Sequence, residues 1–391
     1  MLTTKIIPLD VETTTKNKGH PFTPENKLVS YASDNFYYYT DPTFHKALHR
    51  EFQDSNIIIG FSFKFDLHWS VRAGVVLDKH IKIWDCQLAE FILKGQKGAY
   101  GSLNEALESY GIPIKLDVVK SYWDQGIDTD QIPIPILEEY NLDDSAKTLQ
   151  LYHIQQEILT DKQKNLVLLL GEDLKTLQNA EYNGIKWDAK KATEKIQNYT
   201  AQVSDIEQRL VTYLPIINHG IFNWDSGDHL SVLLYGGEIN FDYSVSSEET
   251  YKSGSNKGTV YVRNKWFVET VQLPRRFNPL ENSEVKKTKD IPGVSTRFYQ
   301  TDGPTLQQLK TRKKEDMELL VLLQTRSDNK KVLEMILSIE KNREKFGWEN
   351  ELLHPQFNQN VAVTGRLSSS QPNMQNSPEE IDELLISRYN D

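Results

Sequence analysis

The segment from Ile6 to Thr14, IIPLDVETT, constrains the fold of this chain more than any other. Its apolar residues are typical of a buried β-strand, and the polar run that follows ends the strand. Successive side chains of a strand point to opposite faces, so Asp10 and Glu12 project from the same face. Two carboxylates so placed can bind one divalent cation, because Mg²⁺ prefers oxygen ligands.

This pattern is weak by itself. An ordinary strand that ends in a solvated acidic turn has the same sequence, so other segments must support a metal site. Pro8 also lies inside the strand and has no N–H to donate to a neighbouring strand. It therefore favours an edge position for this strand.

Composition limits the class of protein. A chain of 391 residues with 38% apolar and 26% charged residues is expected to form two or three soluble globular domains. No run approaches the roughly 20 apolar residues of a membrane span, and the N-terminal residues do not resemble a signal peptide. The lack of such a run predicts no membrane partner, and the single cysteine, Cys86, predicts a reducing, cytoplasmic setting.

Charge is distributed unevenly along the chain. The net charge is −10, but residues 252–314 contain 14 Lys or Arg and 5 Asp or Glu, which gives a local charge of +9. Such a distribution fits a metal-dependent nuclease with a separate DNA-binding segment, although basic runs are also typical of solvated surface.

Strand and helix patterns alternate over the first 160 residues, which predicts an α/β domain with a mixed sheet. The expected strands are 4–11, 28–39, 56–61 and 81–84, and the expected helices are 43–53, 65–73, 86–94 and 103–110.

The remaining chain is predicted to be mainly helical, with a β-containing insertion or flexible arm at about 238–303 and loops with short strands at 352–391. In one expected helix, apolar residues recur every three or four positions, which is typical of packing against a neighbouring helix. The expected helices are 165–183, 189–214, 227–235 and 305–345.

Two further acidic residues extend the first pair. Asp66 follows an apolar strand at the start of a helix, and Asp144 comes four residues after Tyr140. Residues four apart share a helix face, so the Tyr140 hydroxyl and the Asp144 carboxylate can point at one site. Four carboxylates from three segments could bind two metal ions about 4 Å apart and promote in-line attack on a phosphodiester.

The order D-x-E, then an aspartate after an apolar strand, then Y-x-x-x-D resembles the DEDDy 3′-to-5′ proofreading exonucleases. The resemblance covers roughly the first 160 residues and includes the stretches WDCQLAEFIL and GSLNEALESYGI. It implies an RNase H-like α/β fold and a metal-dependent 3′-to-5′ exodeoxyribonuclease.

The same resemblance implies residue roles. Asp10, Glu12 and Asp144 would bind the metal that activates the attacking water, and Asp10 would be shared with a second metal that Asp66 supports. Tyr140 would orient the water, and the cofactors would be two Mg²⁺ or Mn²⁺ ions. All five residues are thus candidate catalytic residues.

Two positions near these motifs are expected to contact the DNA strand, namely Thr13 and Ser62. Ser62 stands where the family has an asparagine. The resemblance therefore implies weaker or altered strand binding, with catalysis retained.

A second resemblance covers the C-terminal half. HPQFNQNVAVTGRLSSSQPNMQNSP at 354–378 resembles the segment of family A DNA polymerases that opens the palm. AEYNGIKWD at 180–188 and FNWDSGDHLSVLLYGG at 222–237 resemble the start of the thumb in that family. Polar side chains of the first stretch could contact phosphates and the minor groove without reading sequence, namely Arg366, Asn373, Gln375 and Asn376.

These resemblances predict three parts: an exonuclease at 1–160, a thumb-like region at 161–350 with a β-rich insertion at 238–303, and the truncated start of a palm at 351–391. We expect the N-terminal portion of a split or truncated phage-type polymerase, in the bacterial host cytoplasm if phage-encoded. Without palm and fingers motifs it should not synthesise DNA alone.

The expected partners are a single-stranded 3′ end, a primer–template duplex and a second polypeptide with the palm and fingers. Two alternatives stay open. One is a stand-alone exonuclease acting on RNA or DNA, and the other is a catalytically silent DNA-binding subunit of a polymerase.

Overall fold

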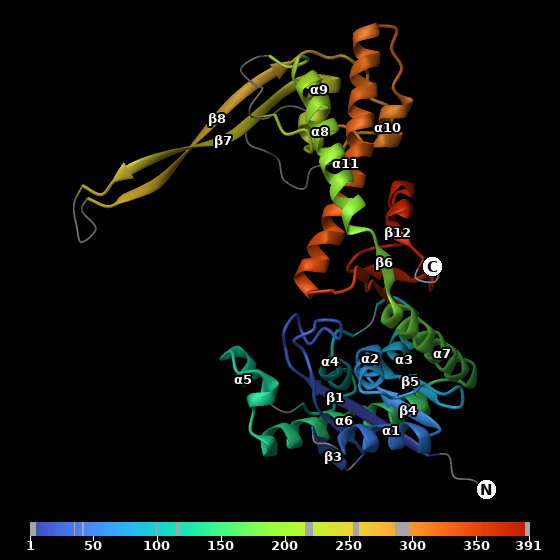
Figure 1. Ribbon diagram of the computed structural model, residues 1–391. Coiled ribbons are helices and arrows are strands. Elements are labelled where there is room, and N and C mark those ends of the chain that lie inside the picture. The colour runs from blue at the N-terminus through green and yellow to red at the C-terminus, as the bar shows by residue number, and fades with distance from the viewer. Residues whose placement is uncertain are drawn as a thin grey trace. The chain divides into compact units, whose positions relative to one another are not determined.

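The structure is a computed structural model that describes residues 5–34, 36–40, 43–98, 100–114, 118–215, 222–252, 258–285 and 297–387, with only the backbone for 241–243. The chain forms two compact units. Unit 1 contains Met1–Ala192 and Met335–Asp391, and unit 2 contains Thr193–Glu334. Figure 1 shows the elements of both.

The core of unit 1 is a five-stranded sheet with the order β3-β2-β1-β4-β5. Neighbours β3, β2 and β1 are antiparallel, whereas β1, β4 and β5 are parallel. The predicted mixed sheet is therefore confirmed. The strands are β1 (Ile6–Thr13), β2 (Leu28–Ser33), β3 (Phe36–Tyr39), β4 (Ile57–Gly60) and β5 (Lys82–Asp85).

Two predictions about these strands were wrong. The expected strand 28–39 is two strands, because the chain reverses beyond Ser33 with Asp34 at a φ of 52°. β1 is central despite Pro8. The reason is that β1 pairs with β4 through Ile6 to Pro8, and its pairing with β2 begins only at Leu9. Pro8 therefore lies outside the ladder between β1 and β2. The N–H that proline lacks is not needed to bond a carbonyl of β2.

Helices cover both faces of this sheet. Ile58 and Ile83 pack on one side with residues of α1 and α2, whereas Ile59 and Trp84 pack on the other with residues of α4 and α6. Parallel strands buried on both faces need such apolar runs. The helices of this region are α1 (Phe44–Asp54), α2 (Lys64–Arg72), α3 (Cys86–Leu93), α4 (Leu103–Ser109), α5 (Val118–Asp124), η1 (Thr129–Gln131), α6 (Ile134–Ile158) and α7 (Asp161–Asn183).

Helix α7 begins at Asp161, four residues before the predicted start. Thr160 accepts a hydrogen bond from the Gln163 backbone N–H, and the Gln163 side chain accepts one from the Thr160 N–H, which forms a capping box. This arrangement satisfies two donors that would otherwise lack partners at the helix start.

The C-terminal segment returns to unit 1. β6 (Ile185–Trp187) is the middle strand of a small sheet between β12 (Leu385–Ile386) and β9 (Leu352–Leu353). The other elements are β10 (Gln356–Asn358), β11 (Ser368–Ser370) and η3 (Glu379–Leu384). The polymerase-like stretch 354–378 is therefore in the same unit as the exonuclease-like residues.

Unit 2 has its own apolar core, built from α8, α9, α10, α11 and the base of a β-hairpin. The predicted amphipathic stripe buries Ile206, Leu210 and Leu214 there. The expected helix 305–345 is two helices, because a non-helical stretch separates α10 from α11. The elements are α8 (Ala189–Val211), α9 (Gly227–Tyr235), β7 (Gly237–Thr250), β8 (Val260–Leu273), α10 (Gly303–Gln308) and α11 (Lys314–Phe346), of which α8 and α11 extend into both units.

Among the helices in the described ranges, none has the length and apolar character needed to cross a membrane.

A buried aromatic cluster in unit 1 contains a titratable group. The His20 ring is 5% exposed and stacks on Phe346 at 4.0 Å, and the Phe22 backbone N–H donates to its Nδ1. Burial lowers the pKa of His20 to about 4, and the charges of His354, His68 and Lys345 add to this effect against the opposing charge of Glu181.

This cluster predicts acid sensitivity. His20 has a pKa of about 6.5 when unfolded, so the unfolded chain takes up its proton first as the pH falls. The contribution of neutral His20 to the free energy of unfolding is complete above pH 6.5. About 3 kcal/mol of the free energy of unfolding is lost as the pH falls to about 4. In urea unfolding at several pH values, His20→Phe is expected to remove this part of the pH dependence. The exposed control His153→Gln should keep it.

Candidate active site

The predicted carboxylate pair lies on β1. In the ladder with β2, Asp10 is opposite Ala32 and Glu12 is opposite Ser30, so both side chains leave the same face. Asp10 is partly buried and Glu12 is 8% exposed. The Asn141 side chain donates to Asp10 Oδ2 at 2.6 Å and to the Asp10 backbone carbonyl at 3.3 Å.

Asp66 is fixed against the same strand. It lies in the first turn of α2, which begins shortly after β4, and it is 6% exposed. The Val11 backbone N–H, between the two carboxylates of β1, donates to Asp66 Oδ1 at 3.0 Å. The structure thus joins the second predicted segment to the first.

Helix α6 carries the third segment. Tyr140 and Asp144 are both partly buried and lie one turn apart. The Tyr140 ring packs against the cluster that includes Val29 and Leu137, and it meets the Trp123 ring edge-on at 6.5 Å. α6 lies next to β1 in the fold, so it can present both residues toward the carboxylates of that strand.

Electrostatics show that the carboxylates form one cluster. Burial raises the pKa of Asp10 well above its ordinary value, and repulsion from Glu12, Asp66 and Asp144 raises it further, against the Asn141 hydrogen bond. Burial also raises the pKa of Asp66, and the hydrogen bond from the Val11 N–H partly opposes this rise. Carboxylates from three separated segments therefore act on one another.

The donor set fits a hard divalent cation by its chemistry, because it offers buried carboxylate oxygens whose mutual repulsion a cation would relieve. In the described ranges, however, no three His, Cys, Asp or Glu side chains are arranged as a metal-binding group. Mg²⁺ usually keeps several waters and substrate oxygens as ligands, so it does not need a closed protein shell.

Two functional positions were missed at the sequence level. Asn141 orients Asp10, and it also accepts a hydrogen bond from Ser30 on β2. Asp85 accepts bonds from the backbone N–H groups of Ser62, Phe63 and Gln87, which holds the turn before α2. Asn141 directly follows Tyr140 in the motif, and Asp85 ends an apolar strand before a helix, so both had a sequence signal.

A buried ionic network fixes the other side of α2. Glu181 of α7 is 2% exposed, and its Oε1 accepts from Lys64 Nζ at 2.5 Å and from the Phe357 N–H at 2.6 Å. Its Oε2 is 2.7 Å from His68 Nε2. Lys64 also donates to the Phe357 carbonyl. This network joins α2, which carries Asp66, to α7 and β10.

The predicted DNA-binding residues fall into two groups. Thr13 and Ser62 lie next to the segments that were predicted to bind metal. Thr13 is 7% exposed and its hydroxyl donates to the Thr14 carbonyl, whereas Ser62 adopts a positive φ of 54°. The others are exposed residues of the β10–β11 hairpin and the segment after it, namely Arg366, Asn373, Gln375 and Asn376. The structure does not place this second group with the acidic cluster.

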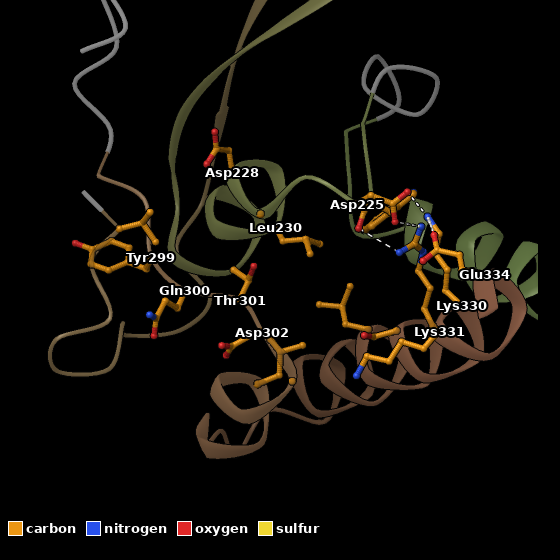
Figure 2. A pocket seen from close by; sticks show the side chains of 18 residues that line it. Asp225, Asp228, Leu230, Tyr299, Gln300, Thr301, Asp302, Lys330, Lys331 and Glu334 are labelled. Atoms are coloured by element: carbon orange, nitrogen blue, oxygen red, sulfur yellow. Dashed lines mark hydrogen bonds and ion pairs between the residues drawn. The ribbon is translucent and has the colours of Figure 1, made fainter. Parts of the chain in front are cut away.

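Unit 2 contains a separate cavity of about 640 Å³, lined by α9, α11 and the segment before α10. Figure 2 shows Asp225, Lys330 and Glu334 close together at one end of the cavity, whereas Asp228 and Asp302 lie apart from them. Arg326 donates to Asp225 at 2.9 Å and to Glu207 at 2.7 Å, and Lys330 also pairs with Asp225. Arg326 and Lys330 are therefore already paired with acidic side chains.

Comparisons with known proteins agree with the C-terminal resemblance. Residues 273–388 match the sequence model of DNA polymerase family A. No curated protein matches the chain. Of the solved structures, 122 chains match.

One of these structures is the POL domain of Pol1 from M. smegmatis in complex with DNA primer–template and dNTP. The TM-score is 0.62 at 17% identity, with 96% of this chain and 53% of that chain covered, so the chain spans about half the length of that structure. The chain is thus similar to DNA polymerase family A in sequence over residues 273–388, and its fold matches about half of that polymerase structure.

Proposed function

We propose that this chain is the 3′-to-5′ proofreading exonuclease part of a family A DNA polymerase of phage type, and that it removes 3′-terminal nucleotides from DNA. The observation that carries the proposal is the acidic cluster, in which Glu12, Asp66 and Asp144 each act electrostatically on Asp10. The sheet order β3-β2-β1-β4-β5 supports an RNase H-like exonuclease fold for this part of the chain.

The proposed roles follow from the residues. Asp10, Glu12, Asp66 and Asp144 would hold two Mg²⁺ or Mn²⁺ ions, which would supply stabilisation of the negative charge that develops on the phosphate. Asn141 fixes the orientation of Asp10 through a 2.6 Å hydrogen bond. Tyr140 lies one turn before Asp144 and can orient the attacking water from the same side of α6.

Binding of the DNA strand next to this cluster is assigned to Thr13 and Ser62. Ser62 lies just beyond the carboxyl end of β4, and its backbone N–H donates to Asp85 at 3.1 Å. The residue is therefore held between the end of this strand and the start of α2. A serine is shorter than the asparagine of the family. We therefore expect weaker contact with the strand here.

Incubation with 5′-labelled single-stranded DNA tests the proposal. A ladder of products shortened from the 3′ end in Mg²⁺ or Mn²⁺, lost with a chelator, supports a DNA exonuclease. Equal or faster degradation of RNA would favour a stand-alone exonuclease with broader substrates. Binding of DNA without degradation would favour a catalytically silent subunit.

We further propose that part of the basic span 252–314 grips the primer–template duplex. Lys313 and Lys314 are exposed at the start of α11, in a run with Lys310 and Arg312. Cations that contact phosphates release counterions, so their number sets the salt dependence of binding.

Replacing Lys313 and Lys314 by alanine is therefore expected to reduce the slope of log K against log salt by about two, as measured by duplex binding at several salt concentrations. The matched control is Lys120→Ala on α5, where an exposed lysine pairs with Asp124. A slope that does not change in the double variant would remove these lysines from the interface.

The second polypeptide with palm and fingers stays a prediction. It would join the chain through the start of the palm at 351–391. A neighbouring reading frame that encodes these motifs, and whose product co-purifies with this chain, would support it.

A further inference from the structure

Asn141 is bonded to Asp10 at two places. Its side-chain Nδ2 donates to Asp10 Oδ2 at 2.6 Å and to the Asp10 backbone carbonyl at 3.3 Å. One contact is at the end of the Asp10 side chain and the other is at its backbone, so together they oppose rotation about the χ1 and χ2 bonds of Asp10. Asn141 therefore fixes the direction in which Asp10 presents its oxygens.

Ser30 on β2 fixes Asn141 in turn. The Ser30 hydroxyl donates to Asn141 Oδ1 at 3.2 Å. Ser30 is directly opposite Glu12 in the ladder between β1 and β2, so its side chain lies on the same face of the sheet as the two carboxylates of β1. A backbone carbonyl can only accept, so the NH₂ group of Asn141 faces Asp10 and the amide oxygen is left for Ser30.

Both contacts are shielded from water. Ser30 and Asn141 are fully buried, and they come from β2 and α6, two elements that pack on each other. When one partner of a buried hydrogen bond is removed, water does not readily replace it, and the other partner loses its bond. The pair Ser30–Asn141 is therefore a rigid support behind Asp10.

The rigidity of a carboxylate affects which cation it binds. Mg²⁺ is small and requires near-ideal octahedral geometry, and octahedral oxygen sites also suit Mn²⁺. Ca²⁺ takes about six to eight oxygens in a flexible arrangement, and it often takes both oxygens of one carboxylate. To offer both oxygens to one cation, a carboxylate has to rotate toward it. Asn141 opposes this rotation in Asp10 and already bonds to Oδ2, which leaves Oδ1 to face the cation.

We propose that Ser30 and Asn141 make the acidic cluster selective for Mg²⁺ or Mn²⁺ over Ca²⁺, because they hold Asp10 for contact through one oxygen. This inference rests on the proposed function, since it requires that the cluster binds a divalent cation. Ser30 and Asn141 are positioning residues. Asn141 acts on the cation through Asp10, and Ser30 acts through Asn141.

Calorimetric titration of the full chain with Mn²⁺ and, separately, with Ca²⁺ tests the proposal without DNA. In Asn141→Ala, the dissociation constant for Mn²⁺ is expected to rise by about 10- to 100-fold, the usual result of removing a group that orients a metal ligand. Ca²⁺ should bind as tightly as before, because the carboxylate of Asp10 can then rotate. The ratio of the Ca²⁺ to the Mn²⁺ dissociation constant should therefore fall by about tenfold or more.

Ser30→Ala tests the second step and is the smaller change to the fold. It leaves the Asn141 oxygen without its donor, so the affinity for Mn²⁺ should fall, but by less than in Asn141→Ala. The double variant should bind Mn²⁺ as weakly as Asn141→Ala alone, because Ser30 acts through Asn141. Losses that add in the double variant would overturn this part of the proposal.

Gln155→Ala is the matched control for the loss of a buried amide on α6. Gln155 is fully buried and donates to the Cys86 carbonyl at 2.9 Å and to Glu90 at 2.8 Å. It lies about four turns beyond Asn141 on the same helix. Thermal unfolding should show lower stability in both alanine variants, whereas the ratio of the two dissociation constants should change only in Asn141→Ala.

The outcomes separate this inference from the proposed function. If the unmodified chain binds neither cation, or if Asp10→Asn binds Mn²⁺ equally well, the cluster is not a metal site and both proposals fail. If Asp10→Asn abolishes Mn²⁺ binding but Asn141→Ala and Ser30→Ala keep the ratio of the unmodified chain, only this inference is overturned. Equal loss of both cations in Asn141→Ala would also overturn it, because that is the effect of a merely structural residue.

Discussion

Asp10→Asn is expected to lower the rate of DNA degradation by about a thousandfold, which is the scale of losing a principal electrostatic group in an active site. Asparagine keeps the shape of the side chain, and its oxygen can still accept the hydrogen bond from Asn141. It removes the negative charge that would hold a metal ion in the proposed site. The measurement is the initial rate on 5′-labelled single-stranded DNA in Mg²⁺.

The same variant is expected to fold well. Asp10 is repelled by Glu12, Asp66 and Asp144 when no cation is present, so removal of its charge relieves that repulsion. Thermal unfolding without metal should therefore occur at the same or a higher temperature. Stabilisation by added Mg²⁺ should be smaller than in the unmodified chain.

Asp143→Asn is the matched control. Asp143 directly precedes Asp144 on α6, but its carboxylate pairs with Lys147 at 2.6 Å. The rate should stay near that of the unmodified chain, because Asp143 is paired with Lys147 and is not among the carboxylates that act on Asp10. Full activity in Asp10→Asn, or equal loss in both variants, would contradict the assignment of Asp10.

Glu181→Ala is expected to lower the free energy of unfolding by about 3 to 5 kcal/mol, the usual result of removing one partner of a buried ion pair. The variant removes the carboxylate that Lys64, His68 and the Phe357 N–H share, and Lys64 keeps its hydrogen bond to the Phe357 carbonyl. Lys64 and His68 are largely buried, with side chains 19% and 5% exposed, so water cannot easily replace the carboxylate. Urea unfolding at neutral pH measures the change.

Glu172→Ala provides the comparison on the same helix. Glu172 is 49% exposed and pairs with Lys175 at 2.9 Å, so its removal should cost less than about 1 kcal/mol. Similar effects of the two variants would show that the buried network does not stabilise unit 1.

Local patterns predicted much of unit 1. The carboxylates of β1 share a face because side chains alternate along a strand, and Tyr140 and Asp144 share a face because a helix turns every 3.6 residues. Turn signals were less reliable. The strand 28–39 was expected to be continuous, since its apolar and aromatic residues outweigh the turn at Asp34.

The sequence by itself therefore determined the periodic elements, the mixed sheet, the acidic motifs and the likeness to DNA polymerase family A. Only the tertiary structure decided which partners these residues have. Asn141 reaches Asp10 across 131 positions and Glu181 reaches Phe357 across 176, and β1 became central because it pairs with β4 and β2 along different halves. Such contacts depend on how distant segments pack, and no local pattern encodes that packing.

The β-hairpin of unit 2 shows the same limit. Alternation along β8 places Val260, Val262, Trp266 and Val268 on one face, but the sequence expected only a β-containing insertion or a flexible arm. Their exposure follows from the absence of a packing partner for the outer part of the hairpin among the described residues. Apolar residues in a strand normally predict burial. Only the three-dimensional arrangement shows that these remain in solvent.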